Sequence, residues 1–327
     1  MKVNVSRRLL RAATAVLSGI LMTTAVATTT PAAAQATAPA ACSGYSSSTT
    51  TCVTENAGIG GSSYKVTWYL PNGTASGLML AEHGFSRKCS HLRGTSKAIA
   101  ERGVMVFCVD ADMTGGNPAL GRALGDALAA RTLTPPNGRP LPANYVVGGH
   151  SAGGHFAGVV GARLAGNPSL KGAILFDGVA ASGFTADLQA VSAGGTRPVL
   201  QIAARPSLIN SFNNSFGALG ALGASFVGIQ LVWTGYSGGV PTGGSCHIDS
   251  EGENTDFLGR VAAGCSPNAT QVSWLREFVS VWARDLTTGT RTSSHYCANA
   301  DDLATCGARA RVLLGGSLPL AAVIPNS

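Results

Sequence analysis

Short apolar runs alternate along the chain with longer stretches in which apolar residues recur at helical spacing. Most runs are continuously apolar, which is typical of strands buried on both faces, whereas residues 64–70 alternate and predict an outer strand. The predicted strands are 64–70, 77–82, 104–109, 144–148, 170–176, 199–204 and 226–234. The predicted helices are 91–102, 118–131, 152–164, 255–263 and 271–286, with Asn117 as a possible N-cap. This alternation predicts an α/β fold with a mostly parallel central sheet and helices on both faces.

The first residues follow a different pattern. A basic head without acidic residues precedes an apolar stretch from Ala12 to about Val26, and the small residues Ala34-Gln35-Ala36 follow. This arrangement predicts a secretory signal peptide over residues 1–36. The sequence leaves open whether the Sec or the twin-arginine route exports the protein. The apolar stretch is too short and too interrupted by Thr and Ser to predict a stable membrane anchor. We therefore expect a secreted, extracellular protein with one catalytic domain over residues 37–327.

Removal of that peptide changes the charge balance. Residues 1–36 hold four basic residues and no acidic ones, so the mature chain has 19 Lys and Arg against 16 Asp and Glu, a net charge of +3 instead of +7. The chain has neither a run of Lys and Arg nor aromatic residues interleaved with basic ones. These features exclude strong binding to phosphate backbones, and we expect no nucleic-acid partner.

All eight cysteines lie beyond residue 36, and an even number in an exported chain predicts disulfides. Their spacing does not determine the connectivity. We expect sequential pairing, because each bond then closes a short loop: Cys42–Cys52, Cys89–Cys108, Cys246–Cys265 and Cys297–Cys306. No Cys-x-x-Cys occurs, which argues against a zinc site, and we expect neither a metal nor a cofactor.

The pentapeptide Gly149–Gly153 matches G-x-S-x-G, the pattern of a nucleophile elbow. A second match, Gly235–Gly239, shows that the pattern alone is weak. The elbow must join a buried strand directly to a helix. Ser151 stands between such segments, whereas the residues after Ser237, GGVPTGGS, cannot begin a helix. The sequence therefore predicts Ser151 as the nucleophile and Ser237 as a loop serine.

A serine hydroxyl needs a base to take its proton, and the base needs a carboxylate to orient it. His247 lies in a Gly-rich loop after the last predicted strand, and we predict it to be the base. The loop after strand 199–204 has no carboxylate, so we predict Asp177, directly after strand 170–176, as the acid. Asp249, two residues beyond the histidine, remains the alternative.

Two backbone N–H groups are needed to hold the oxyanion of the tetrahedral intermediate. Ala152 follows the nucleophile and is the first predicted donor. The second is Phe85, in the loop after strand 77–82, where Gly84 would let the backbone approach closely.

The segments His83-Gly84-Phe85, Gly149–Gly154 and Asp177-Gly178, with the late His247-x-Asp249, resemble the α/β-hydrolase superfamily over roughly residues 64–286. The most similar branch is that of chlorophyllase and dienelactone-hydrolase-like esterases, which includes secreted bacterial polyester and lipid esterases. The resemblance implies the α/β-hydrolase fold and a serine carboxylic-ester hydrolase. Chlorophyllase-like proteins draw their acid from an Asp-Gly at this place. The four expected disulfides depart from that branch and disfavour a chlorophyll substrate.

The leading functional hypothesis is a secreted, monomeric serine esterase or lipase acting through an acyl-enzyme. Because no cluster of Arg or Lys marks an anionic substrate, we expect uncharged esters with apolar acyl groups, on small molecules or polymers. The alternatives are an aliphatic polyester depolymerase of the polyhydroxyalkanoate type, an acyltransferase and a non-catalytic binding module. The Gly-rich segment 207–225 is either a mobile flap over the pocket or an ordinary surface helix.

Overall fold

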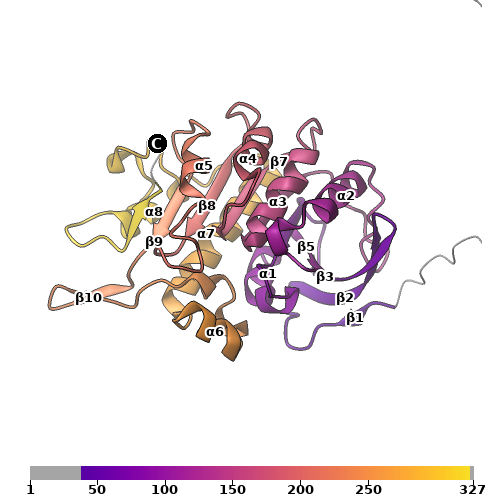
Figure 1. The fold of residues 1–327 in the computed structure, drawn as a ribbon, viewed down its shortest axis with the longest axis horizontal. Helices are drawn as coiled ribbons and strands as arrows, with labels where there is room; N and C mark the ends of the chain where they lie inside the picture. Colours follow the sequence, from indigo (N-terminus) through magenta and orange to yellow (C-terminus); the bar gives the residue numbers. More distant parts are fainter. Residues whose placement is uncertain (1–37, 325–327) are drawn as a thin grey trace, which may run out of the picture. The chain divides into compact units, whose positions relative to one another are not determined.

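The computed structural model describes residues 38–324, so the predicted signal peptide lies outside the described residues. A ten-stranded sheet forms its centre, in the order β1-β2-β3-β5-β4-β6-β7-β8-β9-β12 (Figure 1). These strands are β1 Ala40–Ala41, β2 Thr50–Ile59, β3 Ser62–Pro71, β4 Leu78–Glu82, β5 Met105–Asp110, β6 Tyr145–Ser151, β7 Leu170–Gly178, β8 Val199–Ala203, β9 Gly228–Leu231 and β12 Ala321–Val323. A separate hairpin pairs β10 Gly235–Ser237 with β11 Val240–Thr242.

The six central strands, from β5 to β9 in sheet order, run parallel to one another. Strands β1, β2 and β3 add to one side of the sheet in antiparallel pairing, and β12 does the same beside β9. The carboxyl ends of the parallel strands therefore meet at one edge, where ligands and catalytic groups collect in sheets of this kind.

Helices cover both faces of the sheet. They are α1 Arg93–Ala100, α2 Pro118–Ala129, α3 Ala152–Arg163, α4 Phe184–Ser192, α5 Phe216–Gly220, α6 Phe257–Ala263, α7 Ala269–Thr288 and α8 Ala308–Leu314. Asn117 caps α2, because its side chain accepts a hydrogen bond from the Leu120 N–H. This mostly parallel sheet, with helices on both faces and a sharp strand–helix junction at Ser151, is the α/β-hydrolase fold expected from the sequence.

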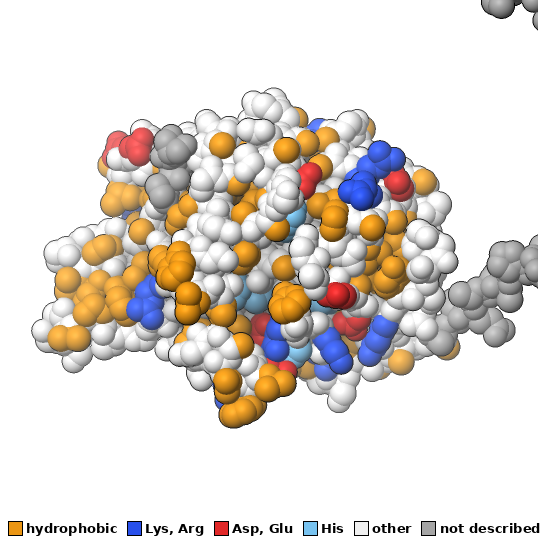
Figure 2. Space-filling view, in the orientation of Figure 1, with side chains coloured by type: hydrophobic (Ala, Val, Ile, Leu, Met, Phe, Trp, Pro, Cys, Tyr) orange, Lys and Arg blue, Asp and Glu red, His pale blue; other side chains and the backbone are white. Residues whose placement is uncertain are grey.

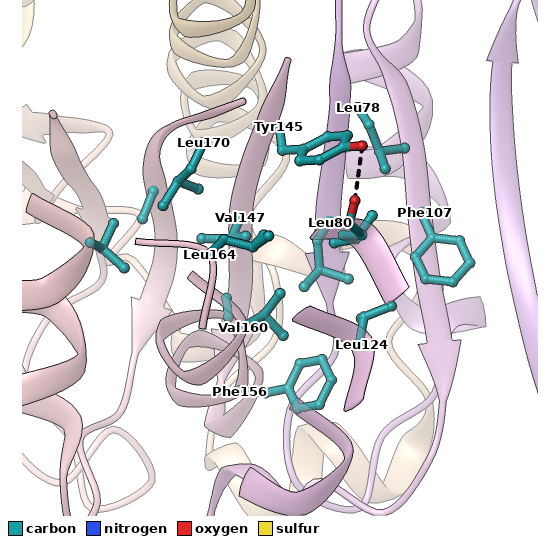
Figure 3. Packing of buried hydrophobic residues seen from close by; sticks show 14 of the residues in the cluster. Leu78, Leu80, Phe107, Leu124, Tyr145, Val147, Phe156, Val160, Leu164 and Leu170 are labelled. Carbon is teal, nitrogen blue, oxygen red and sulfur yellow. Dashed lines mark hydrogen bonds between the residues drawn. The ribbon is translucent and has the colours of Figure 1, made fainter. Parts of the chain in front are cut away.

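Alternation along the strands divides the core into two layers. In β6, Tyr145 and Val147 face a cluster that includes Phe156 of α3 and Leu124 of α2 (Figure 3). Val146 faces the opposite cluster with residues of α1, α7 and α8. The Tyr145 hydroxyl donates to the Leu128 carbonyl at 3.2 Å, which satisfies its polar end within the core. The continuously apolar runs in the sequence thus correspond to strands buried on both faces.

Every predicted strand and helix has a counterpart in the structure, with ends shifted by a few residues. The elements without a predicted counterpart are β1, β2, α4, α5, β10, β11, α8 and β12. Strand β2 is largely polar, and its pairing with β3 is set by a hairpin at Gly60-Gly61, where both φ angles are positive. Of the two alternatives for segment 207–225, an ordinary surface helix is wrong, because the segment consists of turns followed by the short α5.

The four disulfides pair the cysteines in the sequential order expected. Cys89–Cys108 attaches the segment before α1 to β5. Cys246–Cys265 attaches the residue before His247 to the chain just after α6. The second of these bonds restricts the loop that carries the predicted base. Within residues 38–324, no helix has both the length and the apolar character needed to cross a membrane.

Candidate active site

Ser151 occupies a sharp bend between β6 and α3. Its φ of 56° and ψ of −127° are unfavourable for an L-residue, which is typical of a nucleophile elbow. The neighbouring backbone is tightly packed: a Cβ on Gly149 would lie 2.4 Å from the Gly153 oxygen, and one on Gly153 would lie 2.2 Å from the His83 oxygen. Only glycine fits at both positions, which explains the G-x-S-x-G pattern physically. Ser237, in contrast, is an exposed residue of the β10–β11 hairpin.

His247 and Asp177 lie side by side although 70 residues separate them in the chain. The His247 Nδ1 and Asp177 Oδ2 are 2.7 Å apart, and both side chains are buried. Asp177 belongs to the end of β7, and His247 begins a short 3-10 helix. A carboxylate at Nδ1 favours the tautomer with its proton there, so that Nε2 is free to act as a base.

Asp249 serves a different purpose. Its carboxylate accepts hydrogen bonds from the Cys246 N–H at 2.7 Å and the Asn268 N–H at 3.0 Å. Burial raises the pKa of Asp249 to about 7, and the nearby Asp177 adds to the rise. Asp249 therefore supports the turn that carries His247 and makes no hydrogen bond to its ring. Of the two candidate acids, only Asp177 contacts the imidazole.

Ser151 and His247 both line a cavity of about 440 Å³. Among the hydrogen bonds of residues 38–324, none involves the Ser151 hydroxyl. The hydroxyl is therefore not engaged elsewhere among the described residues, and it shares the cavity with His247. Catalytic hydrogen bonds are often long until substrate binds, so this geometry is compatible with proton transfer between the two.

His150 packs against His247 and bonds to its backbone. The two imidazole rings are 4.5 Å apart between centroids, and the His150 Nε2 lies 2.9 Å from the His247 carbonyl oxygen. Complete burial, with a smaller effect of His247, lowers the pKa of His150 well below its usual value. His150 is therefore neutral and donates its Nε2–H to that carbonyl. It positions the backbone of His247 rather than acting on a proton in the cavity.

Gly84 and Phe85 bring the loop after β4 against the nucleophile. A Cβ on Gly84 would lie 2.8 Å from the Ser151 Cβ, so the close approach requires glycine. Phe85 is 58% exposed and lines the cavity, and no hydrogen bond in the described part of the chain uses its N–H. Ala152 begins α3, where an N–H has no acceptor within the helix. Among residues 38–324, neither predicted oxyanion donor uses its N–H in a backbone hydrogen bond.

Glu82 and His83 lie behind this loop and are fully buried. Burial raises the pKa of Glu82 and lowers the pKa of His83. The Glu82 carboxyl group accepts from the His83 and Val109 N–H groups. Cys89 lies near enough to form a metal-like cluster with them, but its sulfur is bonded to Cys108 and cannot be a thiolate ligand. We assign these residues a structural role.

Arg87 joins the loop after β4 to the segment after His247. Its guanidinium donates to both Glu251 oxygens, at 2.7 and 2.6 Å, and to Asp256 at 3.0 Å. Glu251 is completely buried. The sequence does not reveal this pair, because 164 residues separate its members and no local pattern marks it. It holds together the two loops that form the cavity.

We expect Arg87→Met to lower the free energy of unfolding by about 3–5 kcal/mol, because it leaves the buried Glu251 carboxylate without a counter-ion. Urea denaturation at pH 8 measures this. Arg163→Met is the matched control: Arg163 pairs with Asp126, and both side chains are more than half exposed. That control should cost about 0–1 kcal/mol. Equal effects of the two substitutions would contradict the structural role given to Arg87.

Known proteins resemble this chain only distantly. No protein-family model matches the sequence, and no curated protein matches it. Solved structures that resemble it include carboxyl esterase 2 from Tuber melanosporum, with 15% identity and a TM-score of 0.49. The match covers 73% of this chain and 87% of that esterase. A thermostable esterase from Pseudomonas putida has 14% identity and a TM-score of 0.44, and the match covers 76% of this chain and 84% of the esterase. An esterase from Pyrobaculum calidifontis has 15% identity and a TM-score of 0.46, and the match covers 73% of this chain and 85% of the esterase. At these sequence identities and TM-scores, the similarity does not establish an activity for this chain. The activity has to be inferred from the arrangement of the site residues.

Proposed function

We propose that this chain is a secreted carboxylic-ester hydrolase of the α/β-hydrolase superfamily that acts through an acyl-enzyme. The observation that carries the proposal is the buried contact between His247 Nδ1 and Asp177 Oδ2, on the wall of the cavity that also holds the Ser151 elbow. Residues 1–36 are proposed as its signal peptide, and the four disulfides are compatible with export. The mature domain is proposed to act as a monomer without a cofactor.

In this mechanism, His247 Nε2 takes the hydroxyl proton as Ser151 Oγ attacks the carbonyl carbon of the ester. The N–H groups of Phe85 and Ala152 hold the oxyanion of the tetrahedral intermediate. Its collapse breaks the bond to the alcohol, which leaves with the proton from His247. A water molecule, deprotonated by His247, then attacks the acyl carbon, releases the acid and regenerates the serine.

The surroundings of the cavity favour an uncharged, apolar ester. Phe85 and Leu258 line the cavity, and both are more than half exposed, as is Leu208 beside the lining residue Ile209. In Figure 2, hydrophobic side chains flank the histidine atoms visible in the middle of this face. The one basic side chain of the lining, Arg87, is already paired with Glu251. An anionic substrate would therefore find no free cation among the described lining residues.

The same exposed side chains support a second candidate, an extracellular aliphatic polyester depolymerase. A polymer surface covers more of the protein than a small ester does, and Phe257, Val261 and Phe212 add further exposed apolar area. Both candidates use the same catalytic residues. They differ only in whether the chain releases soluble products from an insoluble film.

A panel of p-nitrophenyl esters from acetate to palmitate, with a fluorophosphonate probe, tests the proposal. We expect release of p-nitrophenol from the neutral esters, poor cleavage of a succinate monoester, and covalent labelling at Ser151. Folded protein that neither cleaves any ester nor reacts with the probe would contradict esterase function and favour a binding module. A polyester film added to the panel separates the two candidates, and added alcohols detect acyl transfer.

A further inference from the structure

A third residue contacts the proposed acid. Asn210, which has no exposed surface, donates its Nδ2–H to Asp177 Oδ2 at 3.0 Å, the same oxygen that accepts the hydrogen bond from His247 Nδ1. Its second Nδ2–H bonds to the Arg205 carbonyl at 2.9 Å. Its Oδ1 accepts from the backbone N–H groups of Ser207 and Asn213. These contacts leave the amide a single orientation.

The backbone around Asn210 is built into an unusual shape. Ser211, Phe212 and Asn213 follow one another with φ angles of 51°, 55° and 60°, a left-handed conformation that L-residues avoid. The conformation is held by the Asn213 side chain, which donates a hydrogen bond to the Ala204 carbonyl. Asn214 lies outside this left-handed stretch, and its side chain bonds to both backbone groups of Ala180. Such strain persists only where the surrounding structure enforces it, and it is frequent near active sites.

The Asp177 carboxylate has few other partners. Within residues 38–324, its Oδ1 is buried without a hydrogen bond, and the His247 ring and the Asn210 amide are the donors to its Oδ2. Asn210 carries no charge, so it fixes the carboxylate without neutralising it. A cation here, as at Glu251, would compete with the imidazolium that forms during catalysis.

We propose that Asn210 is a positioning residue for the catalytic acid, and that residues 205–213 form a fixed brace for Asp177 rather than a mobile flap. The inference rests on the proposed function, since it concerns the same Ser151, His247 and Asp177. It gives a reason for the left-handed turn, because this backbone path brings the side-chain amide of Asn210 under the carboxylate.

The test compares three variants of the full mature chain. Asn210→Ala removes the donor, and Asn210→Asp keeps the size but replaces the donor by a second carboxylate. Asn214→Ala is the matched control, because it removes two hydrogen bonds between the same segments without touching Asp177. We expect both Asn210 variants to lower kcat about ten- to a hundred-fold while KM stays within about two-fold, and the control to keep the wild-type kcat.

Fluorophosphonate labelling separates positioning from unfolding. In a partly unfolded variant, a smaller fraction of the molecules is labelled, but the folded ones are labelled with the wild-type rate constant. A misplaced acid instead lowers the labelling rate constant of every folded molecule. We expect Asn210→Ala to label slowly but completely. Wild-type rates for both Asn210 variants, or an equal loss in Asn214→Ala, would overturn the inference and leave the proposed function intact. A wild-type chain that neither labels nor cleaves esters would overturn both.

Discussion

Ser151→Ala should abolish ester cleavage, with kcat lowered by about 10⁵- to 10⁶-fold, because neither His247 nor water can replace the attacking oxygen. The remaining activity would come from substrate binding and from the N–H groups of Phe85 and Ala152. Stability should hardly change, since the Ser151 hydroxyl makes no hydrogen bond within residues 38–324. Initial rates on a p-nitrophenyl ester and thermal denaturation measure the two quantities.

Ser237→Ala is the matched control for this substitution. Ser237 is the central residue of the other G-x-S-x-G match, but it is exposed on the β10–β11 hairpin and outside the cavity lining. We expect its activity to equal that of the wild type. If Ser151→Ala retained more than about a hundredth of the wild-type kcat, the acyl-enzyme mechanism would be wrong.

Asp177→Asn should lower kcat by about 10⁴-fold, the loss that this change causes in serine hydrolases with the same arrangement. A neutral amide cannot stabilise the imidazolium that forms when His247 takes the serine proton, and its N–H can hold the ring in the wrong tautomer. The substitution keeps the volume, and Asp177 Oδ1 has no hydrogen bond to lose. The midpoint of thermal unfolding should therefore stay close to that of the wild type.

The comparison with Asp249 makes this prediction specific. Asp249→Asn alters the turn after His247 but leaves the contact between His247 and Asp177 in place. We expect it to lower kcat by less than about tenfold, with the larger effect on stability because a buried N–H loses its acceptor. A greater loss of kcat for Asp249→Asn than for Asp177→Asn would transfer the role of the acid to Asp249.

Much of the fold was predictable because its signals are local. A buried parallel strand has to be apolar on both faces, so runs such as residues 104–109 and 170–176 are visible in the sequence. The elbow is also local, since the glycines on either side of Ser151 are required by contacts within a few residues and with the neighbouring strand. Strand β2 escaped prediction because its polar residues lie at the side of the sheet, where pairing with β3 rather than apolar burial determines its conformation.

By itself, the sequence determined the α/β class, the position of the elbow and the short list of candidate acids and bases. These follow from residue types and spacings that act over one strand or one turn. Only the tertiary structure decided that Asp177 rather than Asp249 contacts His247, and that His150, Arg87, Glu251 and Asn210 support the site. The physical reason is that hydrogen bonds and burial depend on distances in space. Folding brings these residues together from distant segments, and no local sequence pattern indicates which segments meet.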